Sequence, residues 1–203
     1  MRNHYEPLRT SIGAHIAETA FIGGANLLVE GPTDQILLTG ALSLLRRRGH
    51  PTSELIDLNE VTIVPCASAS HVPYMAYLAR GRDTLKPPCV ALLDDDTSGR
   101  DAISKLTKGE ADGKRILQDR HIINLGDWAK DADLALAAGT VVVEPEDLIP
   151  VAVAVEGARY YAHRFLGLPV GATAALQAND VLNILGDHRG SIFAALKAAF
   201  AAA

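Results

Sequence analysis

Short apolar runs that alternate with helical patterns are the feature that most constrains how this chain can fold. Three such runs occupy residues 26–30, 61–65 and 89–93. Each is too short for a stable helix and is typical of a buried strand, whereas the stretches between them carry apolar residues at helical spacing. Strands that alternate with helices predict parallel β-α-β units, in which helices cover both faces of one sheet.

The ends of the helical stretches are marked by capping and breaking residues. Gly31-Pro32 breaks the first run, Thr33 or Asp34 can cap the next helix, and Arg46-Arg47-Arg48-Gly49 closes that helix with cations and a glycine. The same criteria predict a helical lead-in before Gly23, helices over residues 72–80, 101–106, 148–166, 173–185 and 191–203, and further strands over 120–124 and 140–144.

These elements predict an α/β fold with a mostly parallel sheet of about four to five strands, flanked by helices, and with a C-terminal helical extension. We expect a helical lead-in or linker over residues 1–22 and a sheet domain over residues 23–150. A helical region over residues 151–203 is expected to pack on or beside that domain.

Composition limits the class of protein. Hydrophobic residues make up 48% and charged residues 21%, as in ordinary soluble domains. No apolar run reaches the length of a membrane span and the first residues lack a secretory signal, so we expect a cytoplasmic protein without a membrane partner. Cys66 and Cys89 lack metal-ligand spacing and are expected to be reduced. The net charge of −5 argues against a nucleic-acid coat protein.

Two acidic clusters follow predicted strands. Glu30 and Asp34 follow the first apolar run, and Asp94-Asp95-Asp96 follow the third directly. Functional residues of parallel sheets gather where strands end and helices begin, so we expect both clusters at one edge of the sheet. Carboxylates that meet there would repel one another unless cations lay between them. Their oxygen atoms are the ligands that Mg²⁺ and Mn²⁺ prefer.

Helix capping is the simpler explanation for either acid alone. Asp34 and Asp96 each stand where a helix begins, and aspartate is a common residue at that position. Capping explains three consecutive aspartates after an apolar strand less well. A second acidic cluster at the matching place of another unit weakens the capping explanation further.

The acids also resemble a known pattern. Glu30 at a strand end, followed by Asp94-x-Asp96-x-x-Gly99 after a later strand, resembles the signature of Toprim domains, which topoisomerases, bacterial primases and several nucleases share. Within that group, residues 26–34 (NLLVEGPTD), 92–100 (LLDDDTSGR) and 145–150 (PEDLIP) are similar to motifs of the OLD (overcoming lysogenization defect) family of endonucleases. The resemblance covers about residues 20–150.

That resemblance implies a Toprim fold and a metal-dependent DNA endonuclease that uses two Mg²⁺ or Mn²⁺ ions, in phage defence or DNA repair. It places catalytic roles on Glu30, Asp94, Asp96 and Lys197. The implied metal ligands are Glu30, Asp34, Asp94, Asp96 and Glu146, with Asp147 or Glu144 as substitutes for Glu146. A solvated helix lysine is an equally good interpretation of Lys197.

The chain also departs from the family pattern. OLD proteins resemble fusions of an ABC-type ATPase with a Toprim nuclease, but this sequence has no G-x-x-x-x-G-K-[ST] loop and so no ATP site. We therefore expect either a C-terminal fragment or a stand-alone Toprim protein. The implied partners are DNA, an ABC-type ATPase domain in the full-length chain or a separate subunit, and a second copy in a full-length homodimer.

Two groups of residues have more than one interpretation. The family often carries a glycine-rich segment after the second strand, where this chain has small residues; Ser68, Ser70 or the following His71 could contact phosphate, or the segment could be a tight turn. Cations that could contact DNA, or simply be solvated, are Arg46, Arg47, Arg48, Arg100, Lys105, Lys108, Lys114, Arg115, Arg159 and Arg164.

Other functions stay open. A topoisomerase-like Toprim domain would need a tyrosine nucleophile, but Tyr160 and Tyr161 lie in an amphipathic helix, where packing is the expected role. A primase-like domain would need a template module. A Toprim domain that has lost its chemistry would act as a binding module, and a receiver-like or phosphatase-like protein would need a nucleophilic aspartate with a partner lysine.

Overall fold

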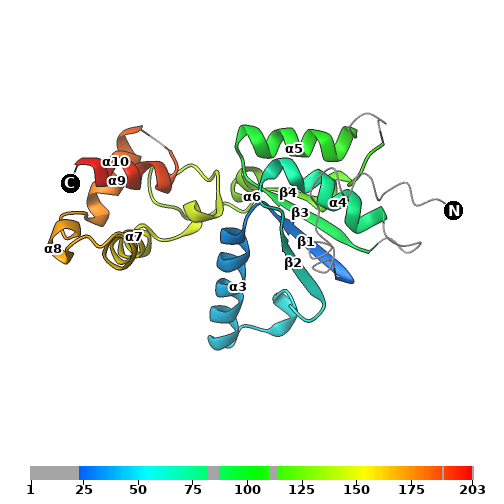
Figure 1. Ribbon diagram of the computed structural model, residues 1–203, viewed down its shortest axis with the longest axis horizontal. Coiled ribbons are helices and arrows are strands. Elements are labelled where there is room, and N and C mark those ends of the chain that lie inside the picture. Colours follow the sequence, from blue (N-terminus) through cyan, green and yellow to red (C-terminus); the bar gives the residue numbers. More distant parts are fainter. Residues whose placement is uncertain (1–22, 82–86, 110–113, 189, 203) are drawn as a thin grey trace. The chain divides into compact units, whose positions relative to one another are not determined.

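The computed structural model describes residues 23–81, 87–109, 114–188 and 190–202 (Figure 1). The predicted helical lead-in over residues 1–22 lies outside them. The strands are β1 (Ala25–Val29), β2 (Val61–Pro65), β3 (Cys89–Leu93) and β4 (Ile122–Asn124). The helices are α3 (Pro32–Arg47), α4 (Val72–Gly81), α5 (Thr97–Lys108), α6 (Leu125–Asp131), α7 (Val151–Phe165), α8 (Val170–Thr173), α9 (Ala178–His188) and α10 (Ile192–Ala202).

The sheet confirms the predicted α/β fold. Its strand order is β2-β1-β3-β4, and β1 runs parallel to both β2 and β3. Leu28 in the middle of β1 pairs with Val64 on one side and with Ala91 on the other. The three apolar runs are therefore three neighbouring parallel strands of this sheet, as their lack of alternation predicts.

Successive side chains of the strands point to opposite faces of the sheet, and each face has its own apolar cluster. Leu28, Val64 and Ala91 pack in one cluster with residues of α4 and α5, such as Ala76 and Leu106. The residues on either side of Leu28, which are Leu27 and Val29, pack on the other face with Ile63 and with Leu38 of α3. Figure 1 shows α3 on one face of the sheet and α4 and α5 on the other.

The first long helix ends as its sequence predicts. Helix α3 ends at Arg47, Arg48 is its C-cap, and Gly49 takes a φ of 78°. The amide of Gly49 donates to the carbonyl of Arg46, and the amide of His50 donates to that of Leu45. The glycine thus satisfies the last carbonyls of the helix, which is the usual function of a glycine in this position.

The predicted fifth strand over residues 140–144 is wrong. Only an isolated bridge, from Thr140 to Gly190, forms there. The carbonyl of Val143 accepts a hydrogen bond from the amide of Asp95, which lies in a loop. The valines of this segment therefore bond to loop residues, which explains why a strand-like composition gives no strand.

Some helices differ from their predicted extents. The helix predicted over residues 173–185 begins later, because α8 ends at Thr173 and α9 spans Ala178–His188, and α5 begins at Thr97, before the predicted start at residue 101. Helix α6 was not predicted, since its seven residues, LGDWAKD, are too few to show a helical pattern.

The chain divides into two compact units. Unit 1 comprises residues up to Leu93 together with Ser98–Ile123, and it contains the sheet and its flanking helices. Unit 2 comprises Asp94–Thr97 and Asn124–Ala203, and its core is an apolar cluster that includes Val155, Leu176, Val181, Leu185 and Ile192. The predicted domain boundary at residue 150 stays a prediction. Among the described residues, no helix is both long enough and apolar enough to cross a lipid bilayer.

Candidate functional site

The order of the strands creates a switch point between β1 and β3. From β1 the chain passes through α3 to β2 on one side of the sheet, and from β3 it passes through α5 to β4 on the other side. These two helices pack on opposite faces. In open α/β sheets, ligands bind at the carboxyl ends of the strands where the chain diverges in this way.

Acidic residues stand directly at this switch point. Glu30 is the first residue after β1, and Asp94 is the first residue after β3. The pairing of Leu28 with Ala91, continued for two residues along each strand, sets Glu30 level with Leu93, the residue before Asp94. Both acids therefore follow their strands at the same edge of the sheet, as the sequence predicts.

Asp34 is fixed in the first turn of α3. It is 7% exposed, and its Oδ2 atom accepts a hydrogen bond of 2.8 Å from the amide of Gly31, which forms one half of a capping box. Burial raises the pKa of the Asp34 carboxyl, and hydrogen bonds from the amides of Gly31 and Glu30 offset only part of that effect. Asp34 therefore caps the helix, and its charge is nevertheless unfavourable in its present surroundings.

Asp95, the middle residue of the triplet, packs against α6. Its amide donates to the carbonyl of Val143 over 2.7 Å, and its Oδ2 atom lies 4.0 Å from the ammonium of Lys130. A Cβ added to Gly126 would lie 2.3 Å from Oδ2 and 2.6 Å from Cβ of Asp95, so only glycine leaves room for this carboxylate. Asp95 therefore has a packing role against α6.

Asn124 supports the same segment from the end of β4. Its Nδ2 atom donates to the carbonyl of Asp94 over 3.2 Å, while its Oδ1 atom accepts from the amide of Asp127 and caps α6. Analysis of the sequence missed both Asn124 and Gly126. An asparagine before a helix is a capping signal that could have indicated Asn124, but nothing in the sequence indicates the contact of Gly126 with Asp95.

Glu146 and Asp147 lie in the 3₁₀ turn η4 (Pro145–Leu148) of unit 2. Asp147 is 1% exposed, and its carboxylate accepts hydrogen bonds from the amides of Val143, Glu144 and Ile192 over 2.9, 3.2 and 2.6 Å. Both oxygen atoms of the Asp147 carboxylate therefore accept hydrogen bonds from backbone amides, and these bonds fix the turn that carries Glu146. This leaves Glu146 as the better candidate for a ligand in this segment.

Lys197 lies on α10, where its side chain is exposed. Its ammonium stands 4.7 Å from the centre of the Phe193 ring, one turn earlier on the same helix. This contact is typical of a surface lysine, and the catalytic role of Lys197 stays a prediction.

Several of the predicted DNA-contacting cations have partners within the protein. Arg46 lies 3.7 Å from Asp57, and Arg115 lies 3.6 Å from Asp119. Arg159 is bound to Glu156 and to two backbone carbonyls of unit 2. Arg159 therefore has a structural role that the sequence did not reveal.

The segment after β2 forms a hydrogen-bonded polar turn. The hydroxyl of Ser68 lies 2.8 Å from that of Ser70 and 3.1 Å from Nδ1 of His71. Ala67 takes a φ of 70°, a conformation that favours glycine, in a segment where the family pattern expects glycine. Burial raises the pKa of the neighbouring Cys66 thiol to about 12, so this thiol is neutral and unreactive at physiological pH.

The chemistry of the predicted ligands fits a hard divalent cation, since all five are carboxylates. Glu30 and Asp34 belong to unit 1, whereas Asp94, Asp96 and Glu146 belong to unit 2. Within the described residues, no three histidine, cysteine, aspartate or glutamate side chains are grouped closely enough to hold a metal ion. The predicted set thus has suitable donor atoms, and its assembly around an ion stays a prediction.

Comparisons with known proteins identify the first part of the chain. Residues 22–96 match the family model of the TOPRIM domain of overcoming lysogenization defect protein-like (OLD-like) proteins. Neither the curated proteins nor the solved structures gave a match. The matched segment runs from the start of β1 to Asp96, so it includes both strand ends that carry acids. It indicates a domain of a class that acts on nucleic acids and binds divalent metals. Residues 22–96 of this chain are therefore similar to the TOPRIM domain of OLD-like proteins.

Proposed function

We propose that this chain is a metal-dependent DNA endonuclease, which cleaves phosphodiester bonds with Mg²⁺ or Mn²⁺ held by Glu30, Asp34, Asp94, Asp96 and Glu146. The observation that carries the proposal is the switch point between β1 and β3, because each of these strands is followed directly by an acid. The match of residues 22–96 to the OLD-like TOPRIM domain supports the same reaction class.

The protein's part in the reaction is to fix these carboxylates before DNA binds. The strand register sets Glu30 and Asp94 at one edge, Asn124 holds the backbone of Asp94, and Asp147 holds the turn of Glu146. When bound, the divalent ions would activate water as Lewis acids and neutralise charge on the phosphate. A backbone that is already fixed in place limits the reorganisation that these carboxylates need when an ion binds, which favours catalysis.

Asp34 contributes through its unfavourable charge. Because burial raises the pKa of this carboxyl, a cation beside it would relieve the cost of its ionised form. A perturbed acid next to a predicted ligand set is a recognised sign of a functional site. The Oδ2 atom of Asp34 accepts a hydrogen bond from the amide of Gly31, which also limits the directions from which an ion could approach.

Cations beyond the acidic ligands would bind the DNA backbone. Arg100 and Lys105 lie on α5, the helix that begins directly after Asp96, and Lys197 is the candidate for a late catalytic lysine. From the OLD resemblance we also propose that an ABC-type ATPase domain and a second copy of the chain complete the active assembly.

A nicking assay tests the proposal. The purified chain is incubated with supercoiled plasmid in Mg²⁺, Mn²⁺ or EDTA, and nicked and linear products are measured. We expect cleavage with either ion and none in EDTA. Glu30→Gln and Asp94→Asn should each lower the rate by about 100-fold or more, as expected for loss of one electrostatic group that stabilises the transition state.

Asp57→Asn is the matched control for that assay. Asp57 is an exposed acid of unit 1. It precedes β2, so it lies at the amino ends of the strands, whereas Glu30 and Asp94 follow their carboxyl ends. The control should keep the rate of the unmodified chain, and circular dichroism should show that all three variants are folded. Cleavage that persists in both Glu30→Gln and Asp94→Asn would refute the proposal.

A non-catalytic Toprim module is the second candidate. It is supported by the lack of three grouped metal-ligating side chains among the described residues. Titration calorimetry with Mn²⁺ separates the two candidates: an endonuclease requires binding that Asp94→Asn weakens, whereas a module without a metal site would give no heat of binding in either protein.

A further inference from the structure

Three aromatic side chains form an exposed cluster on unit 2. Tyr160, Tyr161 and Phe165 lie at the end of α7 and are 64%, 55% and 66% exposed. The rings of Tyr161 and Phe165 are stacked with centroids 5.3 Å apart, and Tyr160 meets Phe165 edge-on at 6.4 Å. The prediction that the two tyrosines are packing residues is therefore wrong, because most of each ring is accessible to solvent.

The core of unit 2 does not need these rings. Helix α7 contributes Val151, Val155 and Ala162 as its buried residues, and the aromatic residues occupy other faces of the helix. Aromatic residues are scarce in this chain, at 5% of its residues, so three in mutual contact at the surface are a notable concentration. Exposed apolar groups of this kind indicate a binding surface more often than scattered single residues do.

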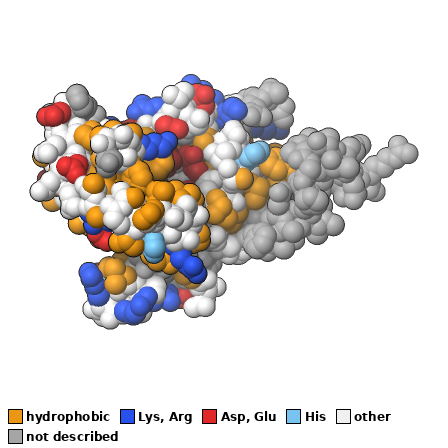
Figure 2. All heavy atoms as spheres, turned by 60° about the vertical axis from the view of Figure 1, so that its left-hand side comes forward, with side chains coloured by type: hydrophobic (Ala, Val, Ile, Leu, Met, Phe, Trp, Pro, Cys, Tyr) orange, Lys and Arg blue, Asp and Glu red, His pale blue; other side chains and the backbone are white. Residues whose placement is uncertain are grey.

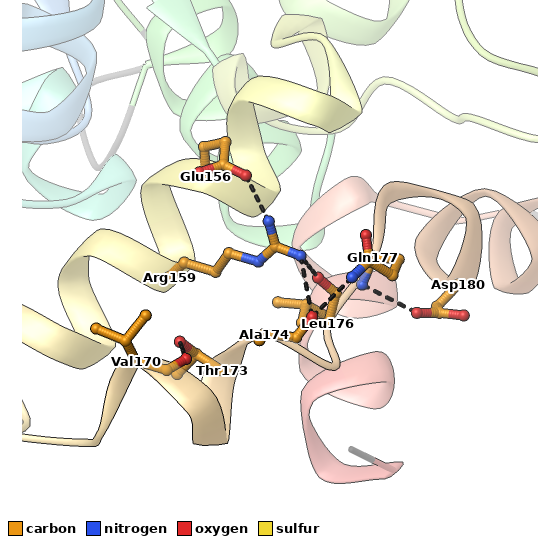
Figure 3. Close-up of polar contacts among 8 residues, drawn as sticks. All are labelled: Glu156, Arg159, Val170, Thr173, Ala174, Leu176, Gln177 and Asp180. Carbon is orange, nitrogen blue, oxygen red and sulfur yellow. Dashed lines mark hydrogen bonds and ion pairs between the residues drawn. The ribbon is translucent and has the colours of Figure 1, made fainter.

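The backbone around the aromatic cluster is held in place by side chains of α7. The guanidinium of Arg159 is bound to Glu156 over 2.5 Å and donates to the carbonyls of Ala174 and Leu176, as Figure 3 shows. Nδ1 of His163 lies 3.1 Å from the carbonyl of Leu168. These bonds tie the end of α7 to the segment that follows it, so the rings stand on a fixed base.

Acidic residues are absent from the sequence that carries the aromatic cluster, and the acid that precedes it, Glu156, is paired with Arg159. Residues 157–179 contain no aspartate or glutamate, although the whole chain has 24 acidic residues and a net charge of −5. Arg164 is exposed between the tyrosines and Phe165, and among the described residues no acid forms an ion pair with it. Figure 2 shows hydrophobic side chains gathered on the side of the molecule that carries α7 to α10, with cationic, histidine and acidic side chains around them.

We propose that Tyr160, Tyr161 and Phe165, with Arg164, form a stacking surface for single-stranded nucleic acid. Bases stack on exposed aromatic rings, and nearby cations bind the phosphates; both features occur here together. An apolar interface with a second copy would not need the absence of acids over these 23 residues of an acidic chain. A negatively charged polymer would be repelled by acids there, so their absence favours a polyanion as the ligand. The inference rests on the proposed function only in assuming that the chain acts on nucleic acid.

Fluorescence anisotropy in EDTA, where the proposed cleavage cannot occur, tests this surface. The probes are labelled single strands of deoxythymidine and of uridine, and a duplex of the same length. We expect either or both single strands to bind, and the duplex to bind less tightly because its bases are already stacked. The two single-strand probes distinguish DNA from RNA as the natural ligand.

Substitutions then assign the binding to the cluster. Tyr161→Ala with Phe165→Ala should weaken single-strand binding by about 10-fold or more, and Tyr161→Trp should preserve it. Arg164→Ala should weaken binding and reduce its dependence on salt, since one phosphate contact is lost. Trp128→Ala is the control, because Trp128 is an exposed aromatic residue of unit 2 that lies on α6, outside the cluster.

The outcomes distinguish this inference from the proposed function. Unchanged single-strand binding in the double variant would overturn the inference, whether or not plasmid nicking occurs. A double variant that binds normally but changes from dimer to monomer in light scattering would assign the surface to a second copy instead. Loss of strand binding in the double variant, in a protein that proves unable to nick DNA, would support the stacking surface and refute only the nuclease.

Discussion

The two units of this protein each bury a carboxylate, and they do so in different ways. In unit 1, Asp34 is 7% exposed, and its Oδ2 atom accepts a hydrogen bond from the amide of Gly31. In unit 2, Asp147 is 1% exposed and accepts from the amides of Val143, Glu144 and Ile192. The pKa of the Asp34 carboxyl is raised by burial that its hydrogen bonds only partly offset.

This difference separates a structural acid from a candidate ligand. A buried carboxylate whose oxygen atoms accept several backbone hydrogen bonds satisfies those amides and serves the fold. One that remains unfavourable after its hydrogen bonds are counted gains from a cation beside it. The position of each acid agrees with this reading, since Asp34 follows a strand end at the switch point whereas Asp147 joins a turn to the start of α10.

Removal of Asp147, the structural acid of unit 2, should have the largest effect on stability. Asp147→Ala leaves three buried amides without an acceptor, so we expect unfolding free energy to fall by about 3 kcal/mol. Asp147→Asn keeps the volume and one acceptor oxygen and should cost less. Urea denaturation followed by circular dichroism measures both changes.

Asp180→Ala is the matched control for Asp147. Asp180 is exposed, lies in the same unit, and accepts a single hydrogen bond of 2.9 Å, from the amide of Gln177. Its loss should cost about 1 kcal/mol, the usual contribution of an exposed helix cap. An equal loss in the two alanine variants would contradict the structural role given to Asp147.

The next largest effect is expected at Gly126, which tests how the aspartate triplet is held. Gly126→Ala would set a methyl group 2.6 Å from Cβ of Asp95, so the loop of Asp95 must shift. We expect a loss of about 1–3 kcal/mol, typical of overpacking, together with slower plasmid cleavage because Asp94 and Asp96 shift as well. Denaturation and the nicking assay measure the two effects separately.

Gly157→Ala is the control for Gly126→Ala and should have the opposite effect on stability. Gly157 lies inside α7, and a Cβ there would meet no heavy atom within 4 Å apart from its chain neighbours and the backbone of its own helix. Alanine is the better helix former, so this variant should gain up to about 1 kcal/mol. If Gly126→Ala were equally harmless, the loop of Asp95 would have to be softer than its contacts indicate.

The sequence predicted unit 1 better than unit 2 for a physical reason. The strands of unit 1 are buried on both faces, so β1, β2 and β3 appear as continuous apolar runs that a short window can detect. In unit 2, the valines at 141–143 have the composition of a strand but bond to a loop. Short α6 carries too little apolar pattern to be detected at all.

The candidate site was predictable where it depends on strand ends. Glu30 and Asp94 could be assigned to one edge because parallel strands that are linked through helices all end on the same side. Contacts between distant residues could not be predicted in this way. The bond from the amide of Ile192 to Asp147 joins residues 45 positions apart, and the packing of Asp95 on Gly126 depends on how the loop folds.

Asp34→Asn should have the smallest effect on stability and the opposite sign. Because the pKa of Asp34 in the folded chain is raised, its protonated form favours folding at low pH, and that contribution is lost as the pH rises through the folded value. Asparagine is never charged and can accept the same bond from Gly31. We therefore expect a small gain in melting temperature at neutral pH and no gain at pH values below the ordinary aspartate pKa.

Metal binding gives the second half of this prediction. If the role of Asp34 is to bind a cation, Asp34→Asn should weaken Mn²⁺ binding in calorimetry and should stabilise the metal-free chain. Asp57→Asn, the exposed control, should change neither quantity, since Asp57 already lies in solvent beside Arg46. A loss of stability in Asp34→Asn at neutral pH, with unchanged Mn²⁺ affinity, would place Asp34 with Asp147 among the structural acids. The switch point would then have to bind its ion through Glu30 and the acids that follow β3.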